Sequence, residues 1–246
     1  MKKRLLVLGL AFTMLAATAC GTSSDDGNKT SKADKTVTAT PNSDKTSETQ
    51  KNDDKKDDAK ESYKSADDIT MDDLKNHEET PAEDFKYRDK SNGEAVIKEY
   101  IGDDPIVVIP NEIDGKKVVD FGKIFTNNKD IVAVRVGDNV ENIKEGAFGN
   151  CDNLKYIILG KNVKVFEHGN VGGKKFEQLE LNDGLEQLGE EGTSGAVIIL
   201  NKDKVEVKIP ESVNHMAFTG AKTLIVKAGS YAESFAKEHN MDYRVE

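Results

Sequence analysis

The chain has 246 residues, of which 36% are hydrophobic and 33% charged, and its formal net charge at pH 7 is -10. A net negative charge argues against nucleic acid as a partner, because a phosphate backbone is bound by clustered Lys and Arg. The chain has two cysteines, which excludes a framework of several disulfides.

The first residues have the pattern of an export signal. Lys and Arg at residues 2–4 precede an apolar run over residues 5–17, and Ala17-Thr18-Ala19-Cys20 is a small-residue cleavage site that ends in cysteine. The run is shorter than the roughly 18 to 20 residues that a bilayer-spanning helix needs. The site resembles a bacterial lipoprotein signal, although Ala17 stands where that family usually has Leu.

The resemblance implies that the thiol of Cys20 carries a lipid and begins the mature protein. Ordinary cleavage after Ala19 is the alternative. Acyl chains would hold the protein on a membrane, so we expect a lipid-anchored protein of a bacterial cell envelope that faces outside the cytoplasm.

The predicted signal peptide covers residues 1–19, and residues 20–84 are predicted to be the lipidated Cys20 followed by a disordered acidic tether. Residues 21–84 include 18 acidic and 10 basic residues and few large apolar ones. Such a composition cannot bury enough apolar surface to fold. Thr70 and Asp73 have the spacing of a helix capping box, which predicts one short helix near the end of the tether.

The folded domain is predicted to span residues 85–246 and to begin with a β-hairpin. Strand-like segments at residues 85–87 and 95–100 flank Ser91-Asn92-Gly93, and Asn-Gly is a strong hairpin signal. We expect this hairpin to cap the first coil of the repeats that follow, because an uncapped coil would expose its apolar interior and unpaired strand edges.

One apolar pattern recurs from residue 106 onward. Its copies begin near Ile106, Ile131, Leu154, Phe176 and Val205, with a half-copy at Leu224. Equivalent positions Val140, Val163 and Leu185 are 23 and 22 residues apart, and the outer periods are 27 and 28. Each copy alternates like two short strands joined by a corner. A unit of this length cannot bury its interior alone, so the copies are predicted to stack as a solenoid.

The motifs of these copies resemble a known repeat family. Leu154-x-x-Ile157-x-Leu159, the corner Ala147-Phe148-x-x-Cys151 and the Ile-Pro pairs at residues 109–110 and 209–210 are similar to the leucine-rich repeats of the BspA type on bacterial surface proteins. The resemblance covers roughly residues 85–246. It implies a mainly β, leucine-rich-repeat solenoid of about five to six short coils.

Two copies depart from the pattern, because Gly-rich sequences at residues 167–173 and 189–195 replace the Ala-Phe-x-x-Cys corner. The shape of these two coils is therefore left open. At the C-terminus, Ser230 and Glu233 have capping-box spacing and predict a helix through about residue 238. Tyr231, Phe235 and Ala236 form its apolar face, and residues 243–245 are predicted to add a last strand, so that helix and strand form a C-terminal cap.

No pattern of a catalytic or metal site stands out. The four histidines are predicted to be exposed residues of the tether, two loops and a helix end, and no pair has metal-ligand spacing; they are His77, His168, His215 and His239. The Gly-rich stretch at residues 169–175 lacks the spacing of a phosphate loop, and no nucleophile elbow is present. Cys151 is predicted to be a buried structural thiol. We expect no cofactor, no metal and no enzymatic activity.

The remaining candidate site is a surface of the solenoid. Residues between the inward-pointing apolar ones point outward and form a ladder with rungs about 4.8 Å apart. The predicted ladder holds Val108, Arg135, Tyr156, Ile158, Gln178, Glu180, Glu206, Lys208 and Ile225. The predicted partner-binding residues are Arg135, Tyr156, Ile158, Gln178, Glu180 and Lys208. Arg135, Tyr156 and Ile158 are the expected anchors, because aromatic and arginine side chains dominate interface energetics.

Three functional hypotheses follow. The first is a non-enzymatic, lipid-anchored recognition module that binds a protein or glycan, with adhesion or host contact implied by the family resemblance. The second is a structural or assembly factor of the envelope that binds itself or a neighbouring envelope protein. The third is a hydrolase with an unrecognised site, which no residue pattern supports.

Overall fold

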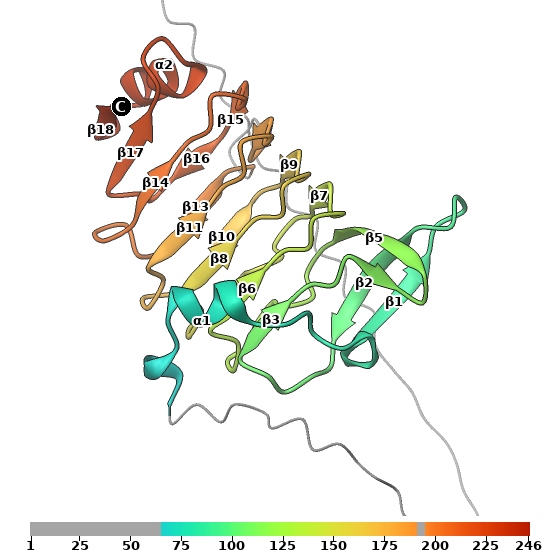
Figure 1. The fold of residues 1–246 in the computed structure, drawn as a ribbon. Helices are drawn as coiled ribbons and strands as arrows, with labels where there is room; N and C mark the ends of the chain where they lie inside the picture. Colours follow the sequence, from blue (N-terminus) through green and yellow to red (C-terminus); the bar gives the residue numbers. More distant parts are fainter. Residues whose placement is uncertain (1–64, 191–194) are drawn as a thin grey trace, which may run out of the picture. The chain divides into compact units, whose positions relative to one another are not determined.

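Short strands repeat along the chain and stack into a β-solenoid (Figure 1). The computed structural model describes residues 65–190 and 195–246. The predicted signal peptide, Cys20 and the tether up to residue 64 lie outside these residues. The stack has about 6 turns, which confirms the predicted mainly β solenoid of about five to six short coils.

The elements of the described residues alternate between short strands and tight corners. The strands are β1 (Phe85–Asp89), β2 (Ala95–Tyr100), β3 (Ile106–Val108), β4 (Glu112–Ile113), β5 (Lys116–Phe121), β6 (Ala133–Arg135), β7 (Asn142–Ile143), β8 (Tyr156–Ile158), β9 (Val165–Phe166), β10 (Gly169–Val171), β11 (Gln178–Glu180), β12 (Gln187–Leu188), β13 (Val197–Ile199), β14 (Glu206–Lys208), β15 (His215–Met216), β16 (Phe218–Thr219), β17 (Thr223–Val226) and β18 (Tyr243–Val245). The helices are α1 (Met71–Asn76), α2 (Tyr231–Glu238) and two short 3-10 turns, η1 (Ala66–Asp68) and η2 (Ala82–Asp84). No helix among the described residues is long and apolar enough to cross a bilayer.

One wall of the solenoid carries the predicted ladder. The parallel strands β3, β6, β8 and β11 form one sheet, and β14, β17 and β18 form another beside it. The central residues Val134, Ile157 and Leu179 are paired in register and are at most 4% exposed. Because successive side chains of a strand point to opposite faces, the flanking residues point outward. We call the outward surface of β3, β6, β8, β11, β14 and β17 the ladder face.

Two other sheets close the coils. One runs in the order β1-β2-β5-β7-β9-β12-β15, and a smaller one in the order β10-β13-β16. The first Gly-rich sequence supplies β10, and the residues after the second supply β13. These departures from the repeat pattern therefore add a third strand to the later coils, with Gly169 in a backbone conformation (φ 138°) that other residues rarely adopt.

Aromatic rings link the coils inside the solenoid. The Phe148 ring lies 6.0 Å from Phe121, 5.9 Å from Phe125 and 6.0 Å from Phe166, measured between centroids. Offset and edge-to-face aromatic pairs at these distances stabilise a core beyond their buried area. Cys151 belongs to the same corner: it is fully buried and its thiol donates to the Phe125 carbonyl (2.9 Å). Its predicted structural position agrees with this burial.

Cys151 should resist thiol reagents in the folded protein. Burial raises the pKa of its thiol to about 12, and the thiolate is the reactive species. At mildly alkaline pH, iodoacetamide should therefore leave Cys151 unmodified in the native chain and alkylate it in concentrated urea, as read by peptide mass spectrometry. Rapid alkylation of the native chain would contradict the burial of this corner.

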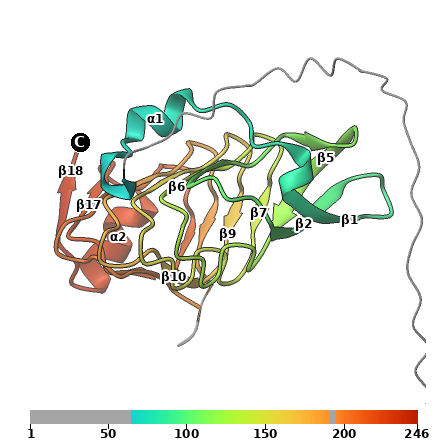
Figure 2. The same cartoon turned by 90° about the horizontal axis from the view of Figure 1, so that it is seen from below.

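Both predicted caps are present. In the N-terminal hairpin, Gly93 has φ 81° and β2 pairs in parallel with β5, so the hairpin joins the repeat sheet. At the other end, the Ser230 hydroxyl accepts from the Glu233 N–H (3.2 Å). α2 then packs on the last coil, and β18 extends the sheet of β17. Figures 1 and 2 both place α2 at the C-terminal end of the stack.

Residues 65–84 differ from the predicted tether. They form η1, α1 and η2, and Thr70 and Asp73 make the predicted capping box in full. Ile69 and Leu74 are completely buried against Ile106, Val132 and Tyr156. We call residues 65–80 the N-terminal strap. The assignment of this segment to a disordered tether was wrong, because a few apolar residues are enough to dock it when the surface beneath is itself apolar.

Candidate functional site

The ladder face is divided into a covered half and an open half. α1 packs on β3 and β6 and crosses in front of the ladder in Figure 1, leaving β11, β14 and β17 uncovered. The amino-acid sequence explains why one half is covered and the other is open. The outward residues of β3, β6 and β8 are largely apolar, including Ile106, Ala133 and Ile158, whereas those of β11 and β14 are Gln, Glu and Lys.

Tyr156, one of the expected anchors, lies under the strap. It is 8% exposed, and its hydroxyl donates to Glu177 Oε2 (2.7 Å). The expectation that Tyr156 is exposed on the ladder was wrong, because Ile69 and Leu74 of the strap pack in the same cluster. Its outward direction on β8 was right.

Arg135 and Ile158 are also engaged by the strap. Arg135 Nη2 donates to the His77 carbonyl, and Ile158 packs against the cluster around Tyr156. Val108 is 2% exposed, and its backbone pairs with Thr80 at 2.9 and 3.0 Å. None of these side chains is freely available to a partner in this structure.

Lysines hold the strap at three points. The ammonium of Lys155 donates to the Ile69 carbonyl (2.9 Å) and the Asp67 carbonyl (3.4 Å). Lys175 pairs with the Asp67 carboxylate (3.0 Å). From the strap itself, Lys75 reaches Glu180 on β11 (2.9 Å). The last two pairs are exposed and contribute little, whereas Lys155 is buried and satisfied by carbonyl groups.

The environment of Tyr156 predicts an alkaline transition. Burial, and then the hydrogen bond to Glu177, raise its pKa to about 12, above the value of about 10 for an unfolded tyrosine. The neutral phenol therefore stabilises the folded form fully below pH of about 10, and this contribution is lost as the pH rises toward about 12. Tyrosinate absorbance of the wild type minus that of Tyr156→Phe should show one phenol that titrates late. A difference curve with its midpoint near pH of about 10 would contradict the burial of Tyr156.

The open half contains a break in the sheet. β11 ends one sheet and β14 begins the next, although the two strands lie side by side. Within the described residues no backbone hydrogen bond joins them. We call this break the seam. It leaves two neighbouring strand edges without the ladder hydrogen bonds that join the other strands of this wall.

A shift at one corner explains the seam. Leu154 and Phe176, the buried corner residues of the preceding coils, stand two positions ahead of their strands. In the next coil the buried residue Val205 directly precedes β14. At the same corner, Asn201 Nδ2 donates to the Phe176 carbonyl (2.7 Å).

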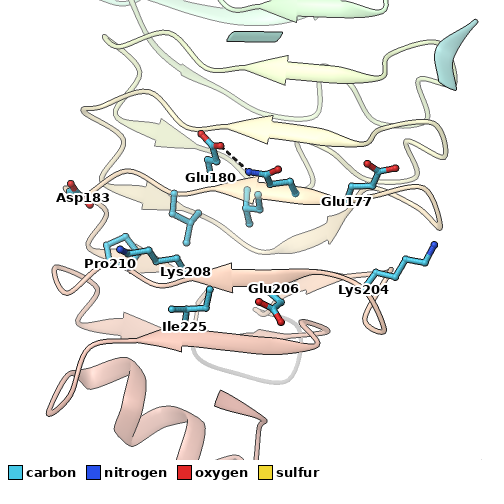
Figure 3. Close-up of a pocket in the computed structure, with 11 residues that line it drawn as sticks. Glu177, Glu180, Asp183, Lys204, Glu206, Lys208, Pro210 and Ile225 are labelled. Atoms are coloured by element: carbon cyan, nitrogen blue, oxygen red, sulfur yellow. Dashed lines mark hydrogen bonds between the residues drawn. The ribbon is translucent and has the colours of Figure 1, made fainter. Parts of the chain in front are cut away.

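A groove of about 550 Å³ follows the seam. Its residues come from β11, β14, β17 and their ends (Figure 3). They are Glu177, Gln178, Leu179, Glu180, Leu181, Asp183, Lys204, Glu206, Lys208, Pro210 and Ile225. We call it the seam groove. Of the predicted site residues, it brings together Gln178, Glu180 and Lys208, and it leaves out Arg135, Tyr156 and Ile158.

Several charges of the groove are held by ion pairs. Gln178 Nε2 donates to Glu180 Oε1 (2.9 Å), which also accepts from Lys75. Lys208 pairs with Glu246, and Glu206 with Arg244 at 3.4 Å. Between these groups lie aliphatic carbons of Leu181, Pro210 and Ile225. Fixed charges around an apolar strip suit recognition of a complementary surface.

The groove residues at the ends of the strands were not predicted from the sequence. Leu181, Asp183, Lys204 and Pro210 lie in corners, where the alternation of a strand does not predict direction. One signal was available: the repeat period lengthens from 22 to 28 residues at this coil. An insertion between two paired strands indicates a change in how the coils stack.

The described residues hold no group of three or more His, Cys, Asp or Glu that could bind a metal ion. Three of the four histidines are less exposed than expected, whereas His239 is exposed, as predicted. The His77 ring lies 3.6 Å from Asp104, and the His168 ring lies between Glu145 and Glu190 at 3.8 and 3.6 Å. His215 is half-buried, and His239 stacks on Phe235 at 4.0 Å. His77 of the strap thus lies beside the loop before β3, and His168 lies between carboxylates of the coils before and after its own.

The sequence matches no protein-family model and no curated protein sequence. Among solved structures, the chain is similar to a leucine-rich repeat protein of T. pallidum, with 23% identity, 60% of this chain and 71% of that chain covered, and a TM-score of 0.48. A leucine-rich repeat protein of Bacteroides capillosus shares 19% identity over 59% of this chain and 95% of that chain, with a TM-score of 0.37. A leucine-rich cell surface protein of Faecalibacterium prausnitzii shares 16% identity over 58% and 53%, with a TM-score of 0.35. At these values the likenesses carry no information on function or partner.

Proposed function

We propose that this chain is a non-enzymatic recognition protein of the bacterial cell surface and that it binds a protein partner through the seam groove. The observation that carries the proposal is the seam itself. It combines two facing strand edges with an apolar strip and fixed charges of both signs, on a rigid stack of coils. Rigidity lowers the entropic cost of binding, because the groove is already formed.

The composition of the groove favours a protein over a small molecule. Pockets for small molecules are concave and lined mainly by hydrophobic and aromatic side chains. The seam groove has no aromatic lining residue, and charged residues make up much of its rim. A glycan, the other ligand of the recognition hypothesis, remains an outcome of the binding experiment below.

The cellular location is part of the proposal. The signal pattern at residues 1–19 and Cys20 at its cleavage point support export and lipid attachment. Residues 21–64 have 10 acidic and 9 basic residues and few large apolar ones, and this polar composition supports a tether that holds the solenoid away from the membrane. A lipid-anchored receptor in this position would serve adhesion or contact with a host or a neighbouring cell.

A second candidate is an envelope assembly factor that binds another copy of itself. It is favoured by the strands at the two ends of the stack: β1 pairs with β2 alone and β18 pairs with β17 alone among the described residues. Unpaired strand edges are templates for pairing with another chain. Self-association of the full chain that persists when the groove is altered would favour this candidate.

The proposal is tested by capturing partners from extracellular and envelope fractions with the full chain and with the variant Lys208→Glu/Ile225→Asp. The matched control is Lys227→Glu/Val165→Asp. Lys227, like Lys208, is an exposed lysine in an ion pair, and Val165, like Ile225, is a half-buried aliphatic residue, but it lies on a different sheet.

We expect a partner that the wild type and the control capture and that the groove variant loses at least about tenfold, the effect of one strong interface contact. All three chains must give the same circular dichroism spectrum. A partner captured equally by the groove variant would place recognition elsewhere, and a partner whose capture is abolished by glycosidase treatment would make the ligand a glycan.

A further inference from the structure

A second, smaller pocket of about 350 Å³ adjoins one end of the seam groove. Its charged lining residues come from the strap and from three successive corners. They are Asp67, Lys155, Lys174, Lys175, Glu177 and Lys204. Glu177 and Lys204 line the groove as well, so the two spaces share a wall. We call it the lysine pocket.

The lysine pocket has positive charge in excess. Both of its carboxylates are already engaged, Asp67 by Lys175 (3.0 Å) and Glu177 by the Tyr156 hydroxyl (2.7 Å). The side-chain ammonium groups of Lys174 and Lys204 make no hydrogen bond or ion pair within the described residues. Five lysines of the central coils, by contrast, pair with a carboxylate on an adjacent coil; they are Lys123, Lys129, Lys144, Lys161 and Lys164. Two unpaired ammonium groups beside one cavity form a local site for a carboxylate, on a domain whose net charge is negative.

The opposite end of the groove has the opposite charge. Asp183 follows β11 and is exposed, and it has no ion pair within the described residues. Figure 3 shows Asp183 and Pro210 at one end of the groove and Glu177 and Lys204 at the other. The distance along β14 from residue 204 to residue 210 corresponds to about 20 Å at about 3.3 Å per residue. An extended peptide of about six residues would span it.

The charges along the groove disfavour a polyanion and favour a peptide that carries charges of both signs. A polyanion such as a sulfated glycan would place negative charge along the whole groove, against Glu180, Glu206 and Asp183. Like charges placed together across an interface cost several kcal/mol. A peptide with one acidic residue and one basic residue avoids this cost, because only its acidic end meets the lysines.

We propose that the groove and the lysine pocket together bind an extended, dipolar peptide segment of the partner, with an Asp or Glu in the lysine pocket and a Lys or Arg about six residues away at Asp183. The proposal rests on the seam groove being the recognition site, and it adds the chemistry of the segment recognised. The lysine pocket includes the strap residue Asp67, so the strap contributes to the site as well as covering the rest of the ladder.

The test uses a random dodecapeptide library displayed on phage and panned against the immobilised full chain. Selected peptides are then assayed as synthetic peptides against the wild type and the variant Lys174→Gln/Lys204→Gln. The control is Lys202→Gln, an exposed lysine of the same corner that lines neither space. Polyglutamate serves as the polyanion competitor.

We expect selected peptides in which an acidic and a basic residue are separated by about six positions. They should bind the wild type and the Lys202→Gln control equally, and the pocket variant at least about fivefold more weakly. Peptides without an acidic residue, peptides that the pocket variant binds normally, the absence of any selected peptide, or stronger competition by polyglutamate than by the selected peptides would each overturn the proposal. If the groove variant loses the captured partner while the pocket variant keeps it, the seam groove is still the recognition site. In that case the proposal that it binds a dipolar peptide is wrong.

Discussion

Replacing Phe148 by Ala should lower the free energy of unfolding by about 3–5 kcal/mol, the range for deleting a buried aromatic side chain. Phe148 is 1% exposed, and its ring meets Phe121 and Phe125 of the preceding coil and Phe166 of the following coil. Removing it opens a cavity at the point where these coils are held together. The denaturation midpoint in urea, followed by circular dichroism, measures the effect.

The comparison for Phe148→Ala is Tyr231→Ala on α2, because Tyr231 is aromatic but 40% exposed. This change should cost less than about 1 kcal/mol, as surface substitutions generally do. Equal costs for the two variants would contradict the central position of the Phe148 ring in the core.

Leu74→Ala should release the strap while the solenoid stays folded. Leu74 is the one fully buried side chain of α1, and shortening a buried Leu to Ala costs about 2–5 kcal/mol. The strap is a short segment with few other buried apolar groups, so a loss of this size exceeds what holds it down. Trypsin should then cleave rapidly after Lys75, as detected by the mass of the remaining fragment.

Glu78→Ala is the matched control, because Glu78 lies in the strap but is exposed. It should be cleaved as slowly as the wild type. Release of the strap should also move the late-titrating phenol of Tyr156 toward the ordinary value. If Leu74→Ala instead unfolds the solenoid together with the strap, the strap is an integral part of the stack and not a separately docked segment.

The register of the repeats could be predicted from the sequence, because the alternation of apolar residues within each strand and the repeat period indicate the same buried positions. Val134, Ile157 and Leu179 fill the same position in successive copies, and no other phase would bury all of them. The caps followed from similarly local signals, Asn92-Gly93 for the hairpin and Ser230 for α2. Hairpin turns and helix caps depend on residues that are close together in the sequence.

The covering of the ladder could not be predicted in this way. The strap docks through Ile69 and Leu74, two apolar residues within a polar stretch, and their effect depends on a surface that forms only after the coils stack. Tyr156 was predicted to point outward, which is correct. Its burial depends on a segment more than eighty positions away in sequence, as the Lys155 to Ile69 hydrogen bond shows.

The open half of the face was only partly predictable. Gln178, Glu180 and Lys208 were identified because they alternate with buried residues on β11 and β14. The break between these strands was not, because it follows from the position of one corner residue, Val205, relative to its strand. The repeat pattern tolerates insertions in the corners, so it does not reveal a corner residue that is shifted by one position.

Hydrogen–deuterium exchange of the full chain, with and without the captured partner, is the most direct test of recognition at the seam. We expect slowed exchange in β11, β14 and the corner at residues 200–204, with no change in β9 and β12 on the other sheet. Protection confined to β9 and β12, or to the hairpin of β1 and β2, would contradict recognition at the seam.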